Sequence, residues 1–315
     1  MSPSPSSPSS PPPFRSGTAV IAGRANAGKS TLLNALLGET VSVVSPVAQT
    51  TRRVIRGILN EPGLQILFLD TPGIKQATHA LGSLLNRTAR GLVTGADAAL
   101  LVLDASIPPH DEDLGWMNKL SREETPVFAI LNKIDRACRR ADYEAAWADT
   151  VARRRERDAT FAPPPWRWFE LSALTRDGLP ALLAALRDAM PEGAPAYPAD
   201  LLTDDPTPYF VADVVRARIN ARLKDELPHA IAVATDHIEE RPDGTVHASA
   251  TIYVEKATQR PIVIGNKGRM IRDIRHAAEK DLASIFGTPH HLDLWVKVEP
   301  DWSRNYWLLK KFGYL

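Results

Sequence analysis

The stretch that decides the fold is Gly23-Arg24-Ala25-Asn26-Ala27-Gly28-Lys29-Ser30, GRANAGKS in one-letter code. It follows an apolar run, 18–22, that predicts a buried strand, and it opens a predicted helix, 30–37. A strand, a loop with this spacing and a helix are typical of a P-loop. Glycines let the backbone wrap phosphate groups, and the helix N-terminus favours negative charge. We therefore expect Lys29 at the β- and γ-phosphates of a nucleotide and the Ser30 hydroxyl on Mg²⁺.

Strand-like and helix-like segments alternate after this loop. Predicted strands lie at 55–59, 65–69, 98–104, 127–131 and 168–171, and predicted helices at 81–94, 111–121, 142–155 and 179–189. Buried runs such as AALLVLD and PVFAILN, separated by helices, predict a mostly parallel sheet with helices on both faces. The fold class expected for this part of the chain is α/β.

Three further polar segments follow predicted strands: Asp70-Thr71-Pro72-Gly73, Asn132-Lys133-Ile134-Asp135 and Ser172-Ala173. Asp70 is expected in the Mg²⁺ shell. The carboxylate of Asp135 can accept hydrogen bonds from both N1–H and the 2-amino group of guanine, a donor pair that adenine lacks. A backbone N–H of the Ser172-Ala173 pair can bind the guanine carbonyl. The residues expected to bind the nucleotide are Gly23, Asn26, Ala27, Gly28, Lys29, Ser30, Thr31, Asp70, Gly73, Asn132, Lys133, Asp135, Ser172 and Ala173.

These four segments, in this order, resemble the nucleotide boxes of the translation-factor-related P-loop GTPases. The resemblance implies GTP and GDP as ligands and a switch threonine between the first two boxes, for which Thr51 is favoured and Thr50 is the alternative. The expected Mg²⁺ ligands are Ser30, Thr51 and Asp70. Lys29, Thr51 and Gly73 are the residues expected to assist hydrolysis.

Two positions bear on the rate of hydrolysis. Ile74 stands where Ras-like proteins carry a glutamine that orients the attacking water, which predicts slow intrinsic hydrolysis. Asn26 resembles the asparagine of relatives in which a potassium ion lies between the phosphates and substitutes for an arginine finger. We carry K⁺ binding by Asn26 as a hypothesis.

Composition changes twice along the chain. Residues 1–13, rich in Ser and Pro, have too little apolar surface to offset the entropy of ordering and are expected to be a disordered tail. Closely spaced prolines predict a linker at 191–208. The expected domains are therefore a nucleotide-binding domain at 14–190 and a second domain, with a C-terminal extension, at 209–315.

The second domain has concentrated positive charge around a Gly-x-x-Gly loop. Its 107 residues hold 16 Lys and Arg against 14 Asp and Glu, but seven of the basic residues lie between Lys256 and Lys280. A helix–strand–strand segment precedes the loop and a helix–strand segment follows it, which resembles a KH domain of the prokaryotic topology (α-β-β-α-α-β). Such a loop lets a nucleic-acid backbone approach closely. The residues expected to bind RNA are Gly265, Asn266, Lys267, Gly268, Arg269, Arg272 and Arg275, and the apolar residues expected to line the adjoining groove are Ile262, Ile264, Ile271 and Ile274.

A P-loop GTPase followed by one KH domain resembles the Era family of ribosome-assembly GTPases. The resemblance covers about Phe14 to Leu315 and includes Gln49-Thr50-Thr51-Arg52 and the ending Phe312-Gly313-Tyr314-Leu315. It implies GTP-dependent binding of 16S rRNA near its 3′ end and assistance in assembly and maturation of the small (30S) ribosomal subunit.

Composition and rival functions narrow the interpretation. A net charge of +1 excludes a globally basic coat protein, and the single cysteine, Cys138, favours a reducing compartment. The sequence has no apolar run that could span a membrane, so we expect a cytoplasmic monomer, with peripheral membrane contact left open.

A tRNA-modifying GTPase would need a nucleophilic cysteine, a folate site or a flavin site. A membrane-remodelling or metal-transport GTPase would need apolar spans or an amphipathic paddle.

Overall fold

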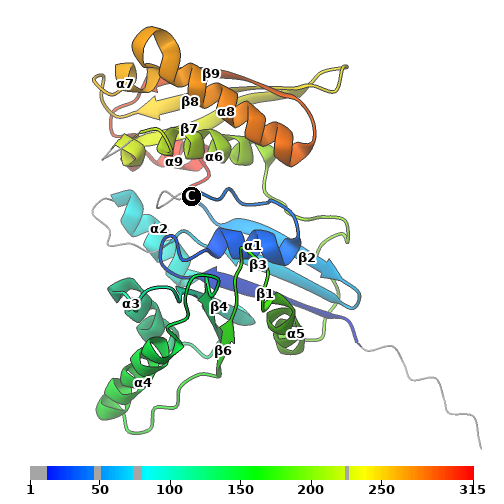
Figure 1. Ribbon diagram of the computed structural model, residues 1–315, viewed down its shortest axis with the longest axis vertical. Helices are drawn as coiled ribbons and strands as arrows, with labels where there is room; N and C mark the ends of the chain where they lie inside the picture. Colours follow the sequence, from blue (N-terminus) through cyan, green and yellow to red (C-terminus); the bar gives the residue numbers. More distant parts are fainter. Residues whose placement is uncertain (1–12, 46–50, 74–79, 224–226) are drawn as a thin grey trace, which may run out of the picture.

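The structure, a computed structural model, describes residues 13–45, 51–73, 80–223 and 227–315. Strands in these residues form a six-stranded sheet and a three-stranded sheet, which Figure 1 shows one above the other. The Ser/Pro tail up to residue 12, the alternative switch residue Thr50 and the position Ile74 lie outside the described residues. Among the described residues, no helix is both long and apolar enough to cross a membrane.

The six-stranded sheet has the order β2-β3-β1-β4-β5-β6. Only β2 and β3 pair in antiparallel fashion, and the remaining neighbours are parallel, as expected. Its elements are β1 (Arg15–Ala22), α1 (Lys29–Leu37), β2 (Ile55–Glu61), β3 (Leu64–Asp70), α2 (Ala80–Gly91), β4 (Ala98–Asp104), α3 (Asp111–Leu120), β5 (Val127–Asn132), α4 (Arg140–Arg157), β6 (Trp166–Glu170) and α5 (Leu179–Ala189).

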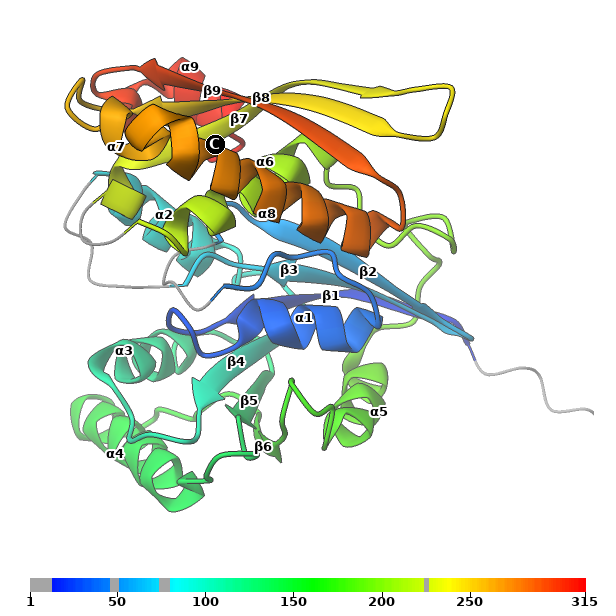
Figure 2. The same ribbon diagram turned by 45° about the horizontal axis from the view of Figure 1, so that its top comes forward.

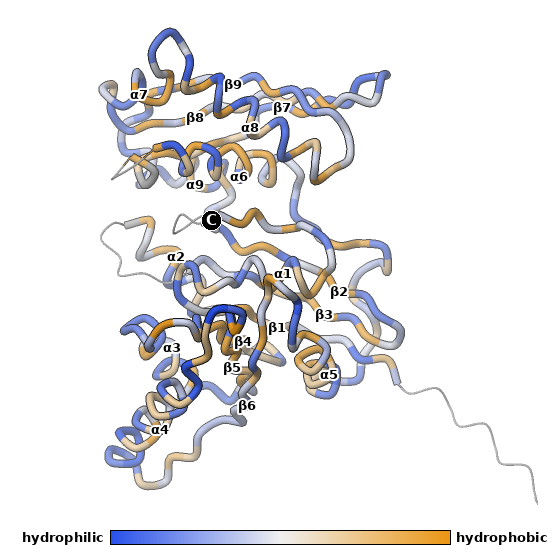
Figure 3. The backbone as a smooth tube through the Cα atoms, viewed as in Figure 1, coloured by the Kyte–Doolittle hydropathy of each residue, from blue (hydrophilic) through white to orange (hydrophobic). Residues whose placement is uncertain are grey.

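Helices cover both faces of this sheet, which confirms the α/β class. Alternate residues of β1 point to opposite cores: Ile21 packs in one core with α1 and α5, and Val20 packs in the other with α2, α3 and α4. Every residue of β4 and β5 is buried, and both strands are strongly hydrophobic in Figure 3. Because the parallel strands all run the same way, the loops that follow β1, β3, β5 and β6 meet at one edge of the sheet.

The three-stranded sheet belongs to an α-β-β-α-α-β unit in the expected order. Strands β7 and β8 are antiparallel, and β8 and β9 are parallel. The helical part of the chain around the Gly-x-x-Gly loop is interrupted at Gly265 and Gly268, so a short turn separates two helices. The elements are α6 (Thr207–Asn220), η1 (Leu227–Ala230), β7 (Ile231–Glu240), β8 (Val246–Val254), α7 (Arg260–Ile264), η2 (Asn266–Gly268), α8 (Arg269–Phe286), β9 (His290–Val298), η3 (Trp302–Arg304) and α9 (Tyr306–Lys311).

The two parts of the chain contact each other through α2 and the C-terminal segment. Figure 2 shows the arrangement of the two parts from a second direction. Leu81 and Leu85 of α2 share an apolar cluster with Trp302, Leu309 and Phe312, on the face of the small sheet opposite α6 and α8. The predicted linker packs on the edge of the large sheet. Its Leu202 carbonyl accepts a hydrogen bond of 2.8 Å from the Ile58 amide in the edge strand β2.

Candidate nucleotide-binding site and Gly-x-x-Gly loop

The loop between β1 and α1 requires glycine at two of its positions. Gly23 has φ +146°, and a Cβ there would lie 2.4 Å from the carbonyl oxygen of Val102. Gly28 has φ +101°, and a Cβ there would lie 2.3 Å from Nδ2 of Asn132. Larger residues at either position would push the loop away from β4 and β5. Helix α1 begins at Lys29, directly after Gly28, so the amides of its first turn open onto the loop.

Lys29 and Gly73 lie together, as the sequence predicts. The Lys29 side chain is buried, and its Nζ donates a hydrogen bond of 2.9 Å to the carbonyl oxygen of Arg24. Burial lowers the pKa of Lys29 to about 8. A Cβ on Gly73 would lie 2.7 Å from Cα of Ala25 and 3.0 Å from Nζ of Lys29. The loop after β3 therefore closes against the P-loop beside a cationic group suited to phosphates.

Three expected metal ligands converge at the start of α1. The Ser30 hydroxyl donates a hydrogen bond of 2.6 Å to Oδ2 of Asp70, and it lies 3.1 Å from Oγ1 of Thr51. Asp70 is fully buried, and burial raises its pKa to about 6. Its other oxygen, Oδ1, has no hydrogen-bond partner among the described residues. Oxygen ligands of this kind, one of them an unsatisfied carboxylate oxygen, fit Mg²⁺.

Ser42 is a neighbour of Asp70 that the sequence did not indicate. Its hydroxyl lies 3.4 Å from Oδ2 of Asp70, and its backbone N–H donates a hydrogen bond of 3.0 Å to Oδ1 of Asn34. Asn34, in the last turn of α1, also accepts a hydrogen bond from the Val41 amide. These bonds fix the start of the segment that leads to Thr51.

The segments after β5 and β6 are tied to the P-loop and to each other. Nδ2 of Asn132 donates a hydrogen bond of 2.9 Å to the Ala27 carbonyl, and Nζ of Lys133 donates one of 2.7 Å to the Asn26 carbonyl. The Ser172 hydroxyl donates a hydrogen bond of 2.6 Å to Oδ1 of Asp135, which orients the carboxylate expected to bind guanine.

The amide of Ala173, which belongs to the pair expected to bind the guanine carbonyl, has a hydrogen-bond partner within the protein. It donates a hydrogen bond of 2.9 Å to Oδ1 of Asn132, so it is already satisfied within the protein. A guanine carbonyl at this position would have to share that amide with Asn132. The bond joins the ends of β5 and β6, which the sequence alone gives no means of predicting.

An ion-pair network under the P-loop was also missed. The guanidinium of Arg24 lies 3.4 Å from Oδ2 of Asp104 and 3.3 Å from Oδ2 of Asp113. Asp104 also pairs with Lys133, at 2.6 Å. Arg24 is inside the P-loop, Asp104 ends β4 and Asp113 lies in the first turn of α3, so the network fixes the loop to two neighbouring elements. Asp104 is an aspartate at the end of a strand, and this is the sequence signal that could have indicated the network.

The Gly-x-x-Gly loop lies between α7 and α8, as expected. Gly265 has φ +75°, and a Cβ there would lie 2.5 Å from Cβ of Met270. Gly268 has φ +73° with open space around it and forms the N-cap of α8. Lys267 between them also has a positive φ, +50°. The loop therefore exposes its backbone where a nucleic-acid backbone can approach.

The side chains on α8 divide into two groups. Arg269 and Arg272 are exposed, and Arg272 donates a long hydrogen bond, 3.4 Å, to the Lys267 carbonyl. Arg275 is turned toward Glu279, with 3.9 Å between Nε and Oε1. The prediction for Ile274 was wrong, because this side chain is completely buried in the core below β7 and β8 and cannot line an open groove. Ile262, in contrast, is 52% exposed.

Comparison with known proteins agrees with this geometry. Residues 18–133 match the model of a family described as 50S ribosome-binding GTPase, and residues 226–303 match that of a KH domain. GTPase Era of Geobacter metallireducens is 38% identical over 306 residues, which cover 96% of this chain and 98% of that protein. The chain belongs to the GTPase Era family. GTPase Era of Synechocystis sp. is 36% identical over 309 residues, covering 98% of this chain and 95% of that protein.

Two solved structures of Era resemble the whole chain. One is a Tyr→Ala variant of Aquifex aeolicus Era bound to GDP and AlF₄⁻, with a TM-score of 0.79. The other is Era in complex with MgGDPNP and nucleotides 1506–1542 of 16S ribosomal RNA, with a TM-score of 0.80. Each is 32% identical and covers 96% of this chain and 99% of its own. The expected family, the two-part fold and the GTPase activity are thereby confirmed, and the expected GTP, GDP and Mg²⁺ agree with the ligands of these Era structures.

Proposed function

We propose that this member of the Era family is a GTP-driven switch that binds 16S rRNA near its 3′ end and assists assembly and maturation of the small ribosomal subunit. The observation that carries the proposal is a direct link between the nucleotide site and the KH domain. Thr51 lies beside Ser30 in the nucleotide site, and the next residue, Arg52, donates a hydrogen bond to the Ile231 carbonyl in the KH sheet. The Era structure that holds MgGDPNP and 16S rRNA supports the choice of RNA.

The nucleotide site has a role for each predicted group. In this proposal Lys29 binds the β- and γ-phosphates, and Ser30, Thr51 and Asp70 hold Mg²⁺, which would neutralise charge that develops on the phosphates. Gly73 offers its backbone amide next to Lys29, and Asp135 selects guanine. In this proposal no side chain orients the attacking water. We therefore expect slow intrinsic hydrolysis.

The proposed switch works because the GTP-bound and GDP-bound states make different contacts. GTP would order Thr51 and the loop after Asp70, and Arg52 would carry that order to the KH domain. A tenfold preference of RNA for the GTP state corresponds to a coupling free energy of about 1.4 kcal/mol. On release of the γ-phosphate, this preference is lost.

The decisive experiment measures RNA binding with a GTP analogue, with GDP and without nucleotide. The RNA is a 3′-terminal 16S fragment, and its scrambled counterpart is the control. We expect sequence-dependent binding that strengthens with the analogue, and Lys29→Ala should abolish the nucleotide effect. Equal, salt-sensitive binding to both RNAs would contradict the proposal.

We further infer a cytoplasmic monomer whose contact with membranes, where it occurs, is peripheral. The inferred cytoplasmic location rests on the proposed role in ribosome assembly, which takes place in the cytoplasm. Flotation with anionic vesicles tests the membrane contact, and light scattering tests the oligomeric state. Co-flotation that persists at about 0.5 M salt would contradict a purely electrostatic, peripheral contact.

A further inference from the structure

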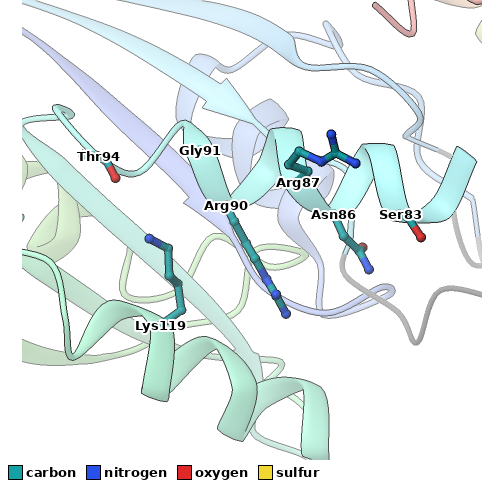
Figure 4. A pocket seen from close by; sticks show the side chains of 7 residues that line it. All are labelled: Ser83, Asn86, Arg87, Arg90, Gly91, Thr94 and Lys119. Atoms are coloured by element: carbon teal, nitrogen blue, oxygen red, sulfur yellow. The ribbon is translucent and has the colours of Figure 1, made fainter. Parts of the chain in front are cut away.

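The end of α3 lies between two grooves that belong to neither the nucleotide site nor the Gly-x-x-Gly loop. One groove, of about 380 Å³, lies between α3 and α4. The other, of about 520 Å³, lies between α2 and α3 and is shown in Figure 4. Both are lined by arginines. We call the following residues the α3 basic surface: Arg87, Arg90, Lys119, Arg122, Arg154 and Arg157.

The α3–α4 groove contains a buried guanidinium nitrogen of Arg154. Nη2 of Arg154 is buried and makes no hydrogen bond within the described part of the chain. Burial, and after it the charges of Arg122 and Arg157, lower the pKa of Arg154. The same guanidinium lies 5.6 Å from the centre of the Phe161 ring. A buried donor among like charges favours an anion, and the ring beside it offers a flat apolar face.

Carboxylates of this groove already have partners. Asp149 forms an ion pair with Arg153 one turn further along α4. Asp158 accepts hydrogen bonds from the amide and hydroxyl of Thr160, at 3.0 and 2.6 Å. Arg122 and Arg157 are exposed, and no ion pair of either is found among the described residues. The groove therefore keeps excess positive charge.

The α2–α3 groove extends this charge to the other side of α3. Figure 4 shows Arg90, from α2, and Lys119, from α3, on facing sides of the groove. Lys119 is paired with Glu123, which also accepts a hydrogen bond of 3.0 Å from the Thr94 hydroxyl. Arg87 and Arg90 are exposed and, within the described ranges, have no carboxylate partner. Positive charge on both sides of one helix suits a ligand with successive phosphates better than a single anion.

We propose that the α3 basic surface is a second RNA-binding site, which binds the phosphate backbone of small-subunit rRNA and places one nucleotide against Arg154 and Phe161. Guanidinium groups bind phosphates in bidentate fashion, and bases of unpaired RNA stack on aromatic rings and guanidinium planes. A flat membrane surface would not enter either groove. The choice of RNA rests on the proposed function, whereas the location rests on the groove residues alone.

The site lies apart from the Gly-x-x-Gly loop. Figure 1 shows α3 and α4 at the end of the large sheet that is remote from the KH domain. Helix α2 lies between these two helices and the KH domain. One short RNA strand at the loop would not reach both places, so the second site requires a longer or folded RNA. Two linked contacts on one RNA raise the overall affinity well above that of either contact.

The test compares two full-length variants that lose the same charge. The groove variant carries Arg122→Gln, Arg154→Gln and Arg157→Gln, and the control variant carries Arg139→Gln, Arg140→Gln and Arg155→Gln, which lie on or next to α4 but outside the groove lining. Binding is measured to full-length 16S rRNA and to its nucleotides 1506–1542. We expect the groove variant alone to bind full-length rRNA about tenfold more weakly, with a salt slope smaller by about 2. Basal GTP hydrolysis and binding of the short segment should be unchanged.

Two results would overturn the proposal. Equal losses in the groove variant and the control variant would show a general charge effect. Unchanged rRNA binding by the groove variant, combined with lost binding to phosphatidylglycerol vesicles, would assign the surface to membranes. If the unmodified chain failed to bind the short segment, the proposed function at the KH domain would be wrong, while the comparison on full-length rRNA would still decide the second site.

Discussion

The guanidinium of Arg52 donates a hydrogen bond of 2.7 Å to the carbonyl oxygen of Ile231, the first residue of strand β7. Arg52 is buried, with 3% of its surface exposed, and directly follows the proposed switch threonine. The next residue, Arg53, pairs with Asp205 at 2.9 Å and with Asp213 at 3.2 Å. Two consecutive arginines thus join the residue after the proposed switch threonine to the linker and to the KH domain.

Replacing Arg52 should uncouple the two sites. We expect Arg52→Gln to reduce the ratio of RNA affinities between the GTP-analogue and GDP states toward one, because a charged hydrogen bond worth about 1.5–3 kcal/mol is lost at the interface. Nucleotide affinity should change little. The matched control is Arg56→Gln, whose exposed ion pair with Asp204 contributes less than about 1 kcal/mol. A full affinity ratio in Arg52→Gln would show that coupling runs through other contacts.

The Gly-x-x-Gly loop should be separable from the GTPase site. Gly268→Asp places a carboxylate where we expect an RNA phosphate, so RNA binding should fall at least tenfold while GTP hydrolysis continues at its normal rate. Gly244→Asp in the β7–β8 turn is the control, because its φ of +78° is close to the +73° of Gly268 and both positions have open space. Both variants then carry the same strain and charge. Similar RNA affinities for the two would argue against a role of the loop.

Magnesium binding should depend on the protonation of Asp70. Its pKa is raised to about 6 by burial, so at pH 5 only about a tenth of the empty sites carry the carboxylate that Mg²⁺ requires. We expect the gain in GDP affinity on adding Mg²⁺ to be about tenfold smaller at pH 5 than at pH 7. Titrations with Mg²⁺ and with EDTA at each pH isolate this gain. Asp70→Asn should abolish it at both pH values.

The same shift predicts the pH dependence of stability without nucleotide. A carboxyl whose folded pKa lies above its unfolded value of 3.8 stabilises the fold at low pH, and that contribution is lost as pH rises from about 4 to 6. We therefore expect Asp70→Asn to raise the free energy of unfolding at pH 7, because a neutral side chain avoids the burial of charge. Chemical denaturation of the metal-free chain measures this difference, and a loss of stability would contradict it.

Arg24 should be a structural requirement of the P-loop. Arg24→Ala leaves Asp113, which is fully buried, without its cation, and removing one partner of a buried pair costs about 3–5 kcal/mol. We expect the midpoint of denaturation to fall and GTP affinity to fall with it. The double variant Arg24→Ala/Asp113→Asn should recover part of the lost stability, since the unpaired charge is removed. No recovery would place the loss elsewhere.

Potassium should accelerate hydrolysis through Asn26. This residue has φ +62°, in the P-loop, and its carbonyl accepts a hydrogen bond from Lys133. We expect several-fold faster hydrolysis in K⁺ than in Na⁺ at equal ionic strength, and equal rates in the two salts for Asn26→Ala. Equal rates in the unmodified chain would refute the hypothesis.

Local patterns in the sequence predicted the sites that depend on backbone geometry. Glycine spacing identified the P-loop and the Gly-x-x-Gly loop, because positive φ angles at Gly23, Gly28, Gly265 and Gly268, with close approaches at the first three, disfavour side chains. The polar segments Asp70–Gly73 and Asn132–Asp135 were found because parallel strands place their carboxyl ends at one edge. The spacing of apolar residues along the sequence likewise predicted the helices and strands of both domains.

Tertiary structure alone decided which distant side chains meet. Arg24 pairs with Asp113, Arg52 binds Ile231, and Ala173 donates to Asn132, although each pair is separated by many residues that carry no sign of the contact. Burial of Ile274 follows from the packing of α8 on the small sheet, and the α3 basic surface follows from the side-by-side placement of three helices. A sequence determines local backbone preferences directly, whereas these contacts exist only because the folded chain brings separate elements within a few ångströms.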